Sequence, residues 1–352
     1  MSLVTVLLPV YNGGPFLPRV LASLLAQTWR DFEVLVIDDG SSDGSAEIAA
    51  AHARSDPRVR VLRNERNLGL ARTLNRGLDE ARSPLVARQD VDDLSHPERL
   101  ARQVAFLEAH AEVALVGAQG WEIDRDERRV GLFDKPCEPD GIDWTMMVDN
   151  AFIHTSVLFR REAVAAAGGY DPAYEYCQDY ELWSRLLRTR RGANLRERLV
   201  SCRLHPGSMT ETIQKDHRHQ SVEVMAREQQ AHLGQARPPS DLELLAQIRG
   251  GVPAAQKPRV LAVLREMQDA FVQRRPQALR SRDFRRTLAR QYGNVLAAYR
   301  FRPLSLMLPA AAQAGLRYPV LPTLVRRAWW AARKRLAGLS APSTDPARQT
   351  RV

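Results

Sequence analysis

Residues 33–45 read Glu-Val-Leu-Val-Ile-Asp-Asp-Gly-Ser-Ser-Asp-Gly-Ser, and this stretch decides the fold. Its first five residues are a short, mostly apolar run of the kind that forms a buried strand. The polar residues that follow favour turns and helix caps, and a helical pattern then runs from Ser45 to Arg54. The stretch is therefore predicted to form one strand–turn–helix unit.

The same unit recurs along the first 110 residues. Short runs rich in Val and Leu predict strands at 3–8, 33–37, 59–62 and 84–87. Apolar residues at three- and four-residue steps predict helices at 16–27, 45–54, 70–82 and 97–110. Pro97 is expected in the first turn of the last helix. This alternation predicts an α/β fold with a mostly parallel sheet flanked by helices.

Polar clusters follow three of the predicted strands, at residues 9–14, 38–45 and 88–93. Parallel sheets bind ligands beyond the carboxyl ends of their strands, so the three clusters should meet at one edge of the sheet. Turn formation and helix capping are an alternative interpretation of residues 38–45. That interpretation does not explain why Asp38 and Asp39 close a buried strand.

The rest of the chain divides at about residue 215. Residues 112–204 show short strands at 113–117, 129–133 and 156–159 and helices at 163–167 and 180–189. Because this stretch has no alternating strand–helix pattern of its own, we expect it to complete a first domain, residues 1–215. Residues 216–352 read as a helical second region interrupted by prolines.

Composition limits the class of protein. The 352 residues are 44% hydrophobic and 26% charged, which suits about two globular domains and argues against disorder. The three cysteines share no short spacing, so no disulfide framework or zinc ribbon is indicated. The first residues lack the pattern of a signal peptide, and no apolar run of 18 residues occurs. A cytoplasmic location is therefore expected.

The net charge of +10 is unevenly distributed. Residues 1–215 hold 27 Lys/Arg and 32 Asp/Glu, a net −5, whereas residues 216–352 hold 24 Lys/Arg and 9 Asp/Glu, a net +15. The basic region could meet an anionic surface. Residues 324–336, with Trp329 and Trp330, fit a helix lying on the inner face of a membrane. An Arg-rich helix packed through Trp329 on the first domain fits equally well.

Asp90-Val91-Asp92 carries the strongest chemical signal. In extended backbone, side chains at i and i+2 point to the same side, so Asp90 and Asp92 could face one ligand. Two adjacent carboxylates repel unless a cation lies near them, and hard oxygen ligands select Mg²⁺ or Mn²⁺. A solvated acidic turn before the next helix is the alternative.

Four motifs follow one another along the first domain: Pro9-Val10-Tyr11-Asn12, Val36-Ile37-Asp38-Asp39-Gly40-Ser41, the segment from Asn67 to Gly77, and Ala87-Arg88-Gln89-Asp90-Val91-Asp92-Asp93. Together they resemble those of the family 2 glycosyltransferases, inverting enzymes of the GT-A fold. The resemblance covers roughly residues 2–210. It implies a GT-A, Rossmann-like catalytic domain that binds a nucleotide-sugar donor.

The resemblance also assigns roles to individual residues. It implies that the nucleotide is held by Pro9, Tyr11, Asp38, Asp39, Arg72 and Asp90. Asp92 matches the metal-binding carboxylate, and His205 is a candidate second ligand for Mn²⁺ or Mg²⁺. Asp179, in Tyr176-Cys177-Gln178-Asp179-Tyr180, matches the catalytic base, with Gln178 where the family usually has Glu. His154 and Arg203 are expected to contact the acceptor or the diphosphate. Arg203 is expected to do so from the start of a flexible loop.

The Q-x-x-R-W signature of processive synthases is missing after Asp179, so one sugar per encounter is expected. A UDP-sugar is the favoured donor and a saccharide or lipid-linked hydroxyl the expected acceptor, in bacterial surface polysaccharide or glycolipid synthesis. A nucleotidylyltransferase is one alternative, although Asn12-Gly13-Gly14-Pro15 offers no cation before Arg19. A polyanion-binding protein acting through the basic tail is another. No nucleic-acid partner is expected, because no recognised module appears.

Overall fold

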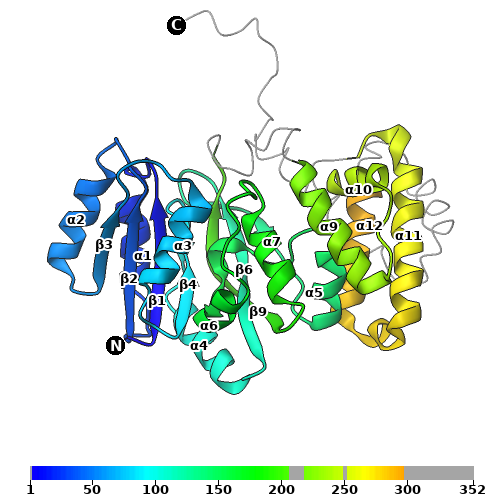
Figure 1. The fold of residues 1–352 in the computed structure, drawn as a ribbon, viewed down its shortest axis with the longest axis horizontal. Helices are drawn as coiled ribbons and strands as arrows, with labels where there is room; N and C mark the ends of the chain where they lie inside the picture. The colour runs from blue at the N-terminus through cyan, green and yellow to red at the C-terminus, as the bar shows by residue number, and fades with distance from the viewer. Residues whose placement is uncertain (1, 206–217, 249–251, 297–352) are drawn as a thin grey trace, which may run out of the picture.

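A computed structural model describes residues 2–205, 218–248 and 252–296 of the chain. The strands join into one nine-stranded sheet, ordered β3-β2-β1-β4-β8-β6-β9-β5, with β7 paired to β6 (Figure 1). The strands are β1 (Val4–Val10), β2 (Phe32–Asp38), β3 (Val59–Arg63), β4 (Leu85–Arg88), β5 (Leu94–Ser95), β6 (Val113–Ile123), β7 (Arg129–Phe133), β8 (Leu158–Arg160) and β9 (Arg191–Arg203).

The first four strands form the parallel half of the sheet that the sequence predicts. β1 pairs in parallel with both β2 and β4, and β2 pairs in parallel with β3. The register places Val10 beside Asp38, so the polar clusters that follow β1 and β2 begin at the same level. The α/β, GT-A-like fold class is confirmed, with each expected strand of this half within two residues of its predicted bounds.

The second half of the sheet is mixed. β8 is antiparallel to β4 and to β6, and β6 is parallel to β9. β6 therefore points the same way as β4, and its carboxyl end extends the edge that carries the polar clusters. β5 adds a short antiparallel pair to β9, with Leu94 opposite Ser201.

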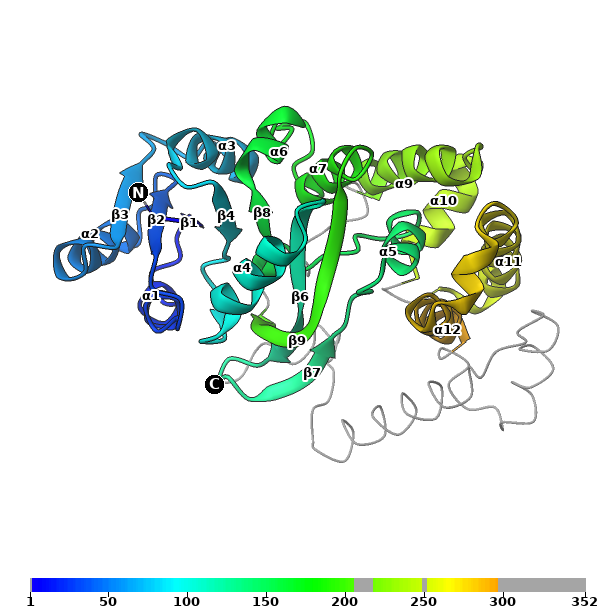
Figure 2. The same cartoon turned by 90° about the horizontal axis from the view of Figure 1, so that it is seen from below.

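Helices cover both faces of the sheet, as Figure 2 shows. In β1 and β2, Leu7, Leu35 and Ile37 face the core shared with α3 (Leu70–Glu80), α6 (Arg161–Ala166) and α7 (Gln178–Leu186). Val6 and Val36 face the opposite core, formed with α1 (Leu17–Leu25), α2 (Ser45–Ser55) and α4 (Arg99–Ala109). Successive side chains of a strand point to opposite faces, so these near-continuous apolar runs are explained by burial on both sides.

Four further helices gather at one end of the molecule, with α5 (Pro139–Met146) between them and the sheet (Figure 1). They are α9 (Arg218–Leu233), α10 (Pro239–Ala246), α11 (Lys257–Arg274) and α12 (Arg282–Leu296). Trp144 of α5 is 0% exposed and lies edge-on to Phe271 and Phe284, and its Nε1 donates to Gln291 Oε1 at 2.5 Å. These helices therefore share one apolar core with α5 and α7.

Some expectations for local structure are wrong. α4 begins at Arg99 after a cap at Glu98, so Pro97 precedes the helix instead of lying in its first turn. β5, β9 and α5 were not expected from the sequence. The expected helix at 324–336 lies outside the described residues. None of the helices within the described ranges is long and apolar enough to cross a membrane.

Candidate active site

The loops after β1 and β2 are tied together by hydrogen bonds from backbone to side chain. The Asn12 N–H donates to Ser41 Oγ at 3.0 Å, the Gly13 N–H to Ser45 Oγ at 3.1 Å and the Gly14 N–H to Asp43 Oδ2 at 2.9 Å. The two polar clusters therefore form a single surface at the carboxyl edge of the sheet. Pro9 is buried in β1 beneath this surface, and Tyr11 is 52% exposed on it.

Asp38, the last residue of β2, and Asp39, which follows it, are both buried. Asp38 Oδ1 accepts from the Ser41 N–H at 3.1 Å, and its Oδ2 pairs with Arg63 Nε at 3.1 Å. Asp39 accepts from Asn64 Nδ2 at 2.6 Å and from the N–H groups of Leu68 and Gly69 at 2.9 and 3.0 Å.

Asp39 therefore fixes the turn that leads into α3. Its Oδ2 accepts one of these three bonds, so a carboxylate lone pair remains for a ligand. Gly40 allows this arrangement: it has a φ of +74°, and a Cβ there would lie 2.6 Å from the backbone carbon of Arg66. Arg72 is exposed in the first turn of α3.

The Asp90-Val91-Asp92 backbone is a turn, not the extended segment that we expected. The two carboxylates consequently have different partners. Asp90 forms an ion pair with Arg88, and Asp92 Oδ2 lies 2.9 Å from His205 Nε2. Burial, together with the charge of Asp92, raises the pKa of Asp90, so the two carboxylates are close enough to interact.

Arg88, the last residue of β4, is a site residue that the sequence reasoning missed. Its side chain is 1% exposed, and its Nε has no hydrogen-bond partner within the described ranges. Burial raises the pKa of Asp93 and of Asp179, and the charge of Arg88 opposes that rise, whereas burial and Arg88 together lower the pKa of His154. The sequence feature that could have identified Arg88 is its place at the end of a buried strand, just before an acidic motif.

Arg203 lies at the end of β9 instead of starting a loop, which corrects our expectation for that residue. Its N–H donates to Asp93 Oδ1 at 2.8 Å and its Nε to the carbonyl of Asp92 at 3.0 Å, while Nη2 pairs with Glu127 at 3.2 Å. The guanidinium thus holds the acidic turn in place, and β9 brings His205 to Asp92. Residues 206–210 of the expected loop lie outside the described ranges.

Asp179 is the second residue of α7, whose N-terminal cap is Cys177. Its Oδ1 accepts from the Tyr180 N–H at 2.8 Å, and its Oδ2 accepts from Asn150 Nδ2 at 2.7 Å. Burial raises the pKa of Asp179, Arg88 and Lys135 lower it, and Asp90 raises it, with a net shift upward. A carboxylate whose pKa is raised while it stays partly accessible is suited to accepting a proton.

His154 lies in the short turn before β8 and contacts Tyr170 and Trp183. Its Nε2 is 3.1 Å from the Tyr170 hydroxyl, and its ring lies against Trp183. Burial and the charge of Arg88 hold the pKa of His154 well below its usual range, so the ring is neutral near pH 7.

Metal binding would require more than the described side chains provide. Within residues 2–205, 218–248 and 252–296, no group of three or more His, Cys, Asp or Glu side chains could hold an ion. Asp92 and His205 are a pair of adjacent oxygen and nitrogen donors, partly open to solvent. The pair fits a divalent cation whose remaining ligands come from a bound diphosphate and water.

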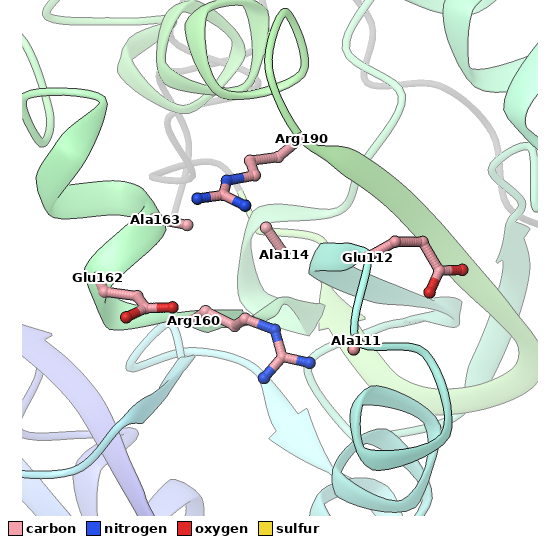
Figure 3. Close-up of a pocket in the computed structure, with 7 residues that line it drawn as sticks. All are labelled: Ala111, Glu112, Ala114, Arg160, Glu162, Ala163 and Arg190. Carbon is pink, nitrogen blue, oxygen red and sulfur yellow. The ribbon is translucent and has the colours of Figure 1, made fainter.

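A hollow of about 170 Å³ lies elsewhere, lined by Ala111, Glu112, Ala114, Arg160, Glu162, Ala163 and Arg190 (Figure 3). Arg160 is paired across the sheet with Leu85, the first residue of β4. The hollow is therefore at the opposite edge of the sheet from Asp90 and Asp92. The Arg160 guanidinium is already bonded to the carbonyls of Val113 and Leu107.

Comparison with known proteins identifies similar sequences and folds. The sequence model described as glycosyl transferase family 2 matches residues 5–167. The chain is 35% identical over 205 residues to the putative glycosyltransferase EpsE of Bacillus subtilis, covering 57% of this chain and 72% of that one. It is also 35% identical to the amylovoran biosynthesis glycosyltransferase AmsE of Erwinia amylovora over 186 residues, covering 52% and 69%.

Among solved structures, TarS 1-349 of S. aureus in complex with UDP-GlcNAc is similar in fold. The TM-score is 0.55 at 17% sequence identity, and the similarity covers 84% of each chain. At this identity the likeness concerns the fold alone.

Proposed function

The chain belongs to glycosyltransferase family 2 and is a transferase, and on that premise we propose that it is inverting and metal-dependent. The donor is a nucleoside diphosphate sugar, with a UDP-sugar favoured, and the acceptor is a hydroxyl group of a saccharide or lipid-linked molecule. One observation carries the proposal: Asp92, which contacts His205, and Asp179 lie at the same edge of the sheet. Asp90, two residues before Asp92, is close enough to Asp179 for its charge to raise the pKa of Asp179.

In this proposal the residues predicted from the sequence divide into three groups. Asp92 and His205 hold Mn²⁺ or Mg²⁺, which when bound would neutralise charge on the departing diphosphate. Pro9, Tyr11, Asp38, Asp39, Arg72 and Asp90 form the nucleotide side of the site. His154 contacts the Tyr170 hydroxyl at the side of the site. Arg203 lies behind the acidic turn and donates to the carbonyl of Asp92.

Asp179 acts as the general base. It accepts the proton of the acceptor hydroxyl while the hydroxyl oxygen bonds to the anomeric carbon of the sugar. The bond from that carbon to the diphosphate oxygen breaks, and the nucleoside diphosphate leaves with the bonding electrons. Attack from the face opposite the leaving group inverts the anomeric configuration.

Two of the similar proteins support the choice of pathway and donor. AmsE is named for amylovoran biosynthesis, and the similar TarS structure is a complex with UDP-GlcNAc. We propose a role in surface polysaccharide or glycolipid synthesis, with the helices after residue 217 forming an acceptor-binding or membrane-surface region. The enzyme would then work in the cytoplasm or at the inner face of the membrane.

The structure also bears on the nucleotidylyltransferase alternative. The backbone N–H groups of Asn12, Gly13 and Gly14 already donate to side chains of the loop after β2. A loop that grips a triphosphate needs such groups free to donate to phosphate oxygens. The loop after β1 therefore favours a glycosyltransferase over this alternative.

Metal-dependent donor binding is the first prediction. We expect UDP to bind the wild-type protein with a micromolar dissociation constant in Mn²⁺ and to lose this binding in EDTA. Asp92→Ala should weaken binding in Mn²⁺ by at least about 100-fold, because even partners of metal ligands cost about 10- to 100-fold when removed. Isothermal titration calorimetry measures both constants.

Asp126→Ala is the matched control, since Asp126 is an exposed carboxylate that pairs with Arg128 at the surface. It should bind UDP as the wild type does. Equal UDP affinity in Mn²⁺ and in EDTA, or wild-type affinity in Asp92→Ala, contradicts the metal assignment. Failure to bind UDP, GDP and dTDP alike contradicts the donor site itself.

A further inference from the structure

Asn150, in the segment between α5 and β8, holds the candidate base directly. Its Nδ2 donates to Asp179 Oδ2 at 2.7 Å, and its Oδ1 accepts from the Phe152 N–H at 3.0 Å. Because a backbone N–H can only donate, the oxygen of the amide must face Phe152 and the nitrogen must face Asp179. Asn150 is therefore a fixed donor to the carboxylate.

Lys135, in the segment between β7 and α5, lies behind Asn150. Its side chain is 2% exposed, and its Nζ donates to the carbonyl of Asn150 and lies 3.7 Å from Asp149 Oδ2. Gln119 holds its backbone on both sides, accepting from the Lys135 N–H at 2.6 Å and donating to its carbonyl at 2.9 Å. The ammonium group is therefore held in one place next to the residue that contacts the base.

The segment that carries Asn150 is anchored from three other elements. The Tyr180 hydroxyl of α7 donates to the carbonyl of Met146, and Gln229 Nε2 of α9 donates to that of Met147 at 3.1 Å. Asn194 Nδ2 of β9 donates to the carbonyl of Ala151 at 3.0 Å. These bonds leave the amide of Asn150 little freedom to turn away from Asp179.

From these contacts we propose that Asn150 and Lys135 are positioning residues for the glycosyl transfer reaction. Asn150 aims the Asp179 carboxylate at the acceptor hydroxyl, and Lys135 fixes Asn150 while supplying a buried positive charge that stabilises the ionised base. This inference rests on the proposed function, in which Asp179 is the base.

The charges around Asp179 explain why the two residues matter. Burial raises the pKa of Asp179, and Arg88 from β4 and Lys135 lower it, while Asp90 raises it. Tyr170 and Cys177 also face it, but burial raises the pKa of each, that of Cys177 to about 12, so both are neutral near pH 7. The Tyr180 N–H, the Asn150 side-chain amide and two buried cations therefore oppose the effect of burial on the Asp179 carboxylate.

Lys135→Met tests the charge. Removing a nearby cation disfavours the ionised carboxylate, so the pKa of Asp179 should rise by about one unit. A base works only when ionised, so the acid limb of the pH–rate profile should move to higher pH, with the rate recovering above it. The rate is measured as release of UDP from the UDP-sugar that the wild type hydrolyses fastest.

Lys257→Met is the matched control, because Lys257 is equally buried but lies at the start of α11, in the helical region. Its acid limb should stay at the wild-type pH. A second variant, Asn150→Asp, keeps the shape of the side chain but sets a carboxyl group against Asp179. It should shift the acid limb at least as far, with the affinity for UDP in Mn²⁺ unchanged.

Carbon-13 NMR of protein labelled at the aspartate carboxyl carbons measures the pKa of Asp179 without turnover, its signal identified by its loss in Asp179→Asn. An upward shift in both Lys135→Met and Asn150→Asp supports the inference. An unshifted pKa in either variant, with the fold intact, overturns it, and a rate lowered equally at every pH does the same. If Asp179→Asn keeps wild-type activity, the proposed function fails instead.

Discussion

Asp179→Asn should lower sugar transfer by about 100- to 10,000-fold, the usual contribution of a positioned general base. An amide cannot accept the proton of the acceptor hydroxyl, while its size and its place at the start of α7 are retained. In the structure the Asp179 carboxylate bonds to Asn150 and to the Tyr180 N–H. The dissociation constant of UDP in Mn²⁺ should therefore stay within about twofold of the wild type. Donor hydrolysis and calorimetry measure the two effects separately.

Asp171→Asn is the control for this substitution. Asp171 accepts from the Ala173 N–H at 2.9 Å in a turn before α7, and an asparagine oxygen can accept the same bond. We expect wild-type activity from it. Loss of UDP binding in Asp179→Asn, to the same extent as in Asp92→Ala, would contradict the separation between a base and a metal-and-nucleotide site.

Trp144→Ala should destabilise the folded protein by about 3–5 kcal/mol, the usual cost of removing a large aromatic side chain from a core. Trp144 is 0% exposed, contacts Phe271 and Phe284, and donates to Gln291. Its removal leaves a cavity where α5 meets α11 and α12. It also leaves the side-chain oxygen of Gln291, Oε1, without this donor. Denaturation in urea, followed by circular dichroism, measures the loss.

Trp29→Ala is the matched control, because Trp29 is only partly buried and its Nε1 donates to a nearby carbonyl, that of Asp31, at 3.1 Å. We expect it to cost much less than Trp144→Ala. Since the helices share a core with α5 and α7, Trp144→Ala should shift one cooperative transition. Two separate transitions, with the one for the sheet unmoved, would show that the helical region folds independently of the first domain.

The sequence predicts the parallel half of the sheet well because each of its elements is local. Strands such as β1 and β2 are buried on both faces and therefore read as unbroken apolar runs, each followed by a turn and an amphipathic helix. β9 shows no such pattern. Arg196, Arg198 and Arg203 lie within it, and its pairing with β6 is interrupted by irregularities of register. Its existence depends on a distant partner strand, which no local pattern reveals.

The candidate site divides in the same way. Motifs identify carboxylates such as Asp92 and Asp179, because acidic residues after buried strands and at helix starts are visible in the sequence. The contacts of these carboxylates are harder to predict. The resemblance offered His205 as a candidate metal ligand, but its contact with Asp92, 113 positions away in the chain, is made by the fold. Asn150 lies 29 positions from Asp179, and no motif pointed to it. Arg88 was adjacent to the motif, but its burial could not be read from its residue type, since arginine is rarely buried.

The packing of α5 determines how this enzyme could be recombined with its relatives. A chimera joined near residue 215 would place the foreign helices against a native Trp144, whose neighbours Phe271, Phe284 and Gln291 would all be replaced. The same exchange would separate Gln229 from the carbonyl of Met147, in the segment that leads to Asn150. A crossover before residue 134 transfers α5 together with the helices that cover it. Exchange of the helical region between relatives should therefore move residues 134–153 together with residues 218–296.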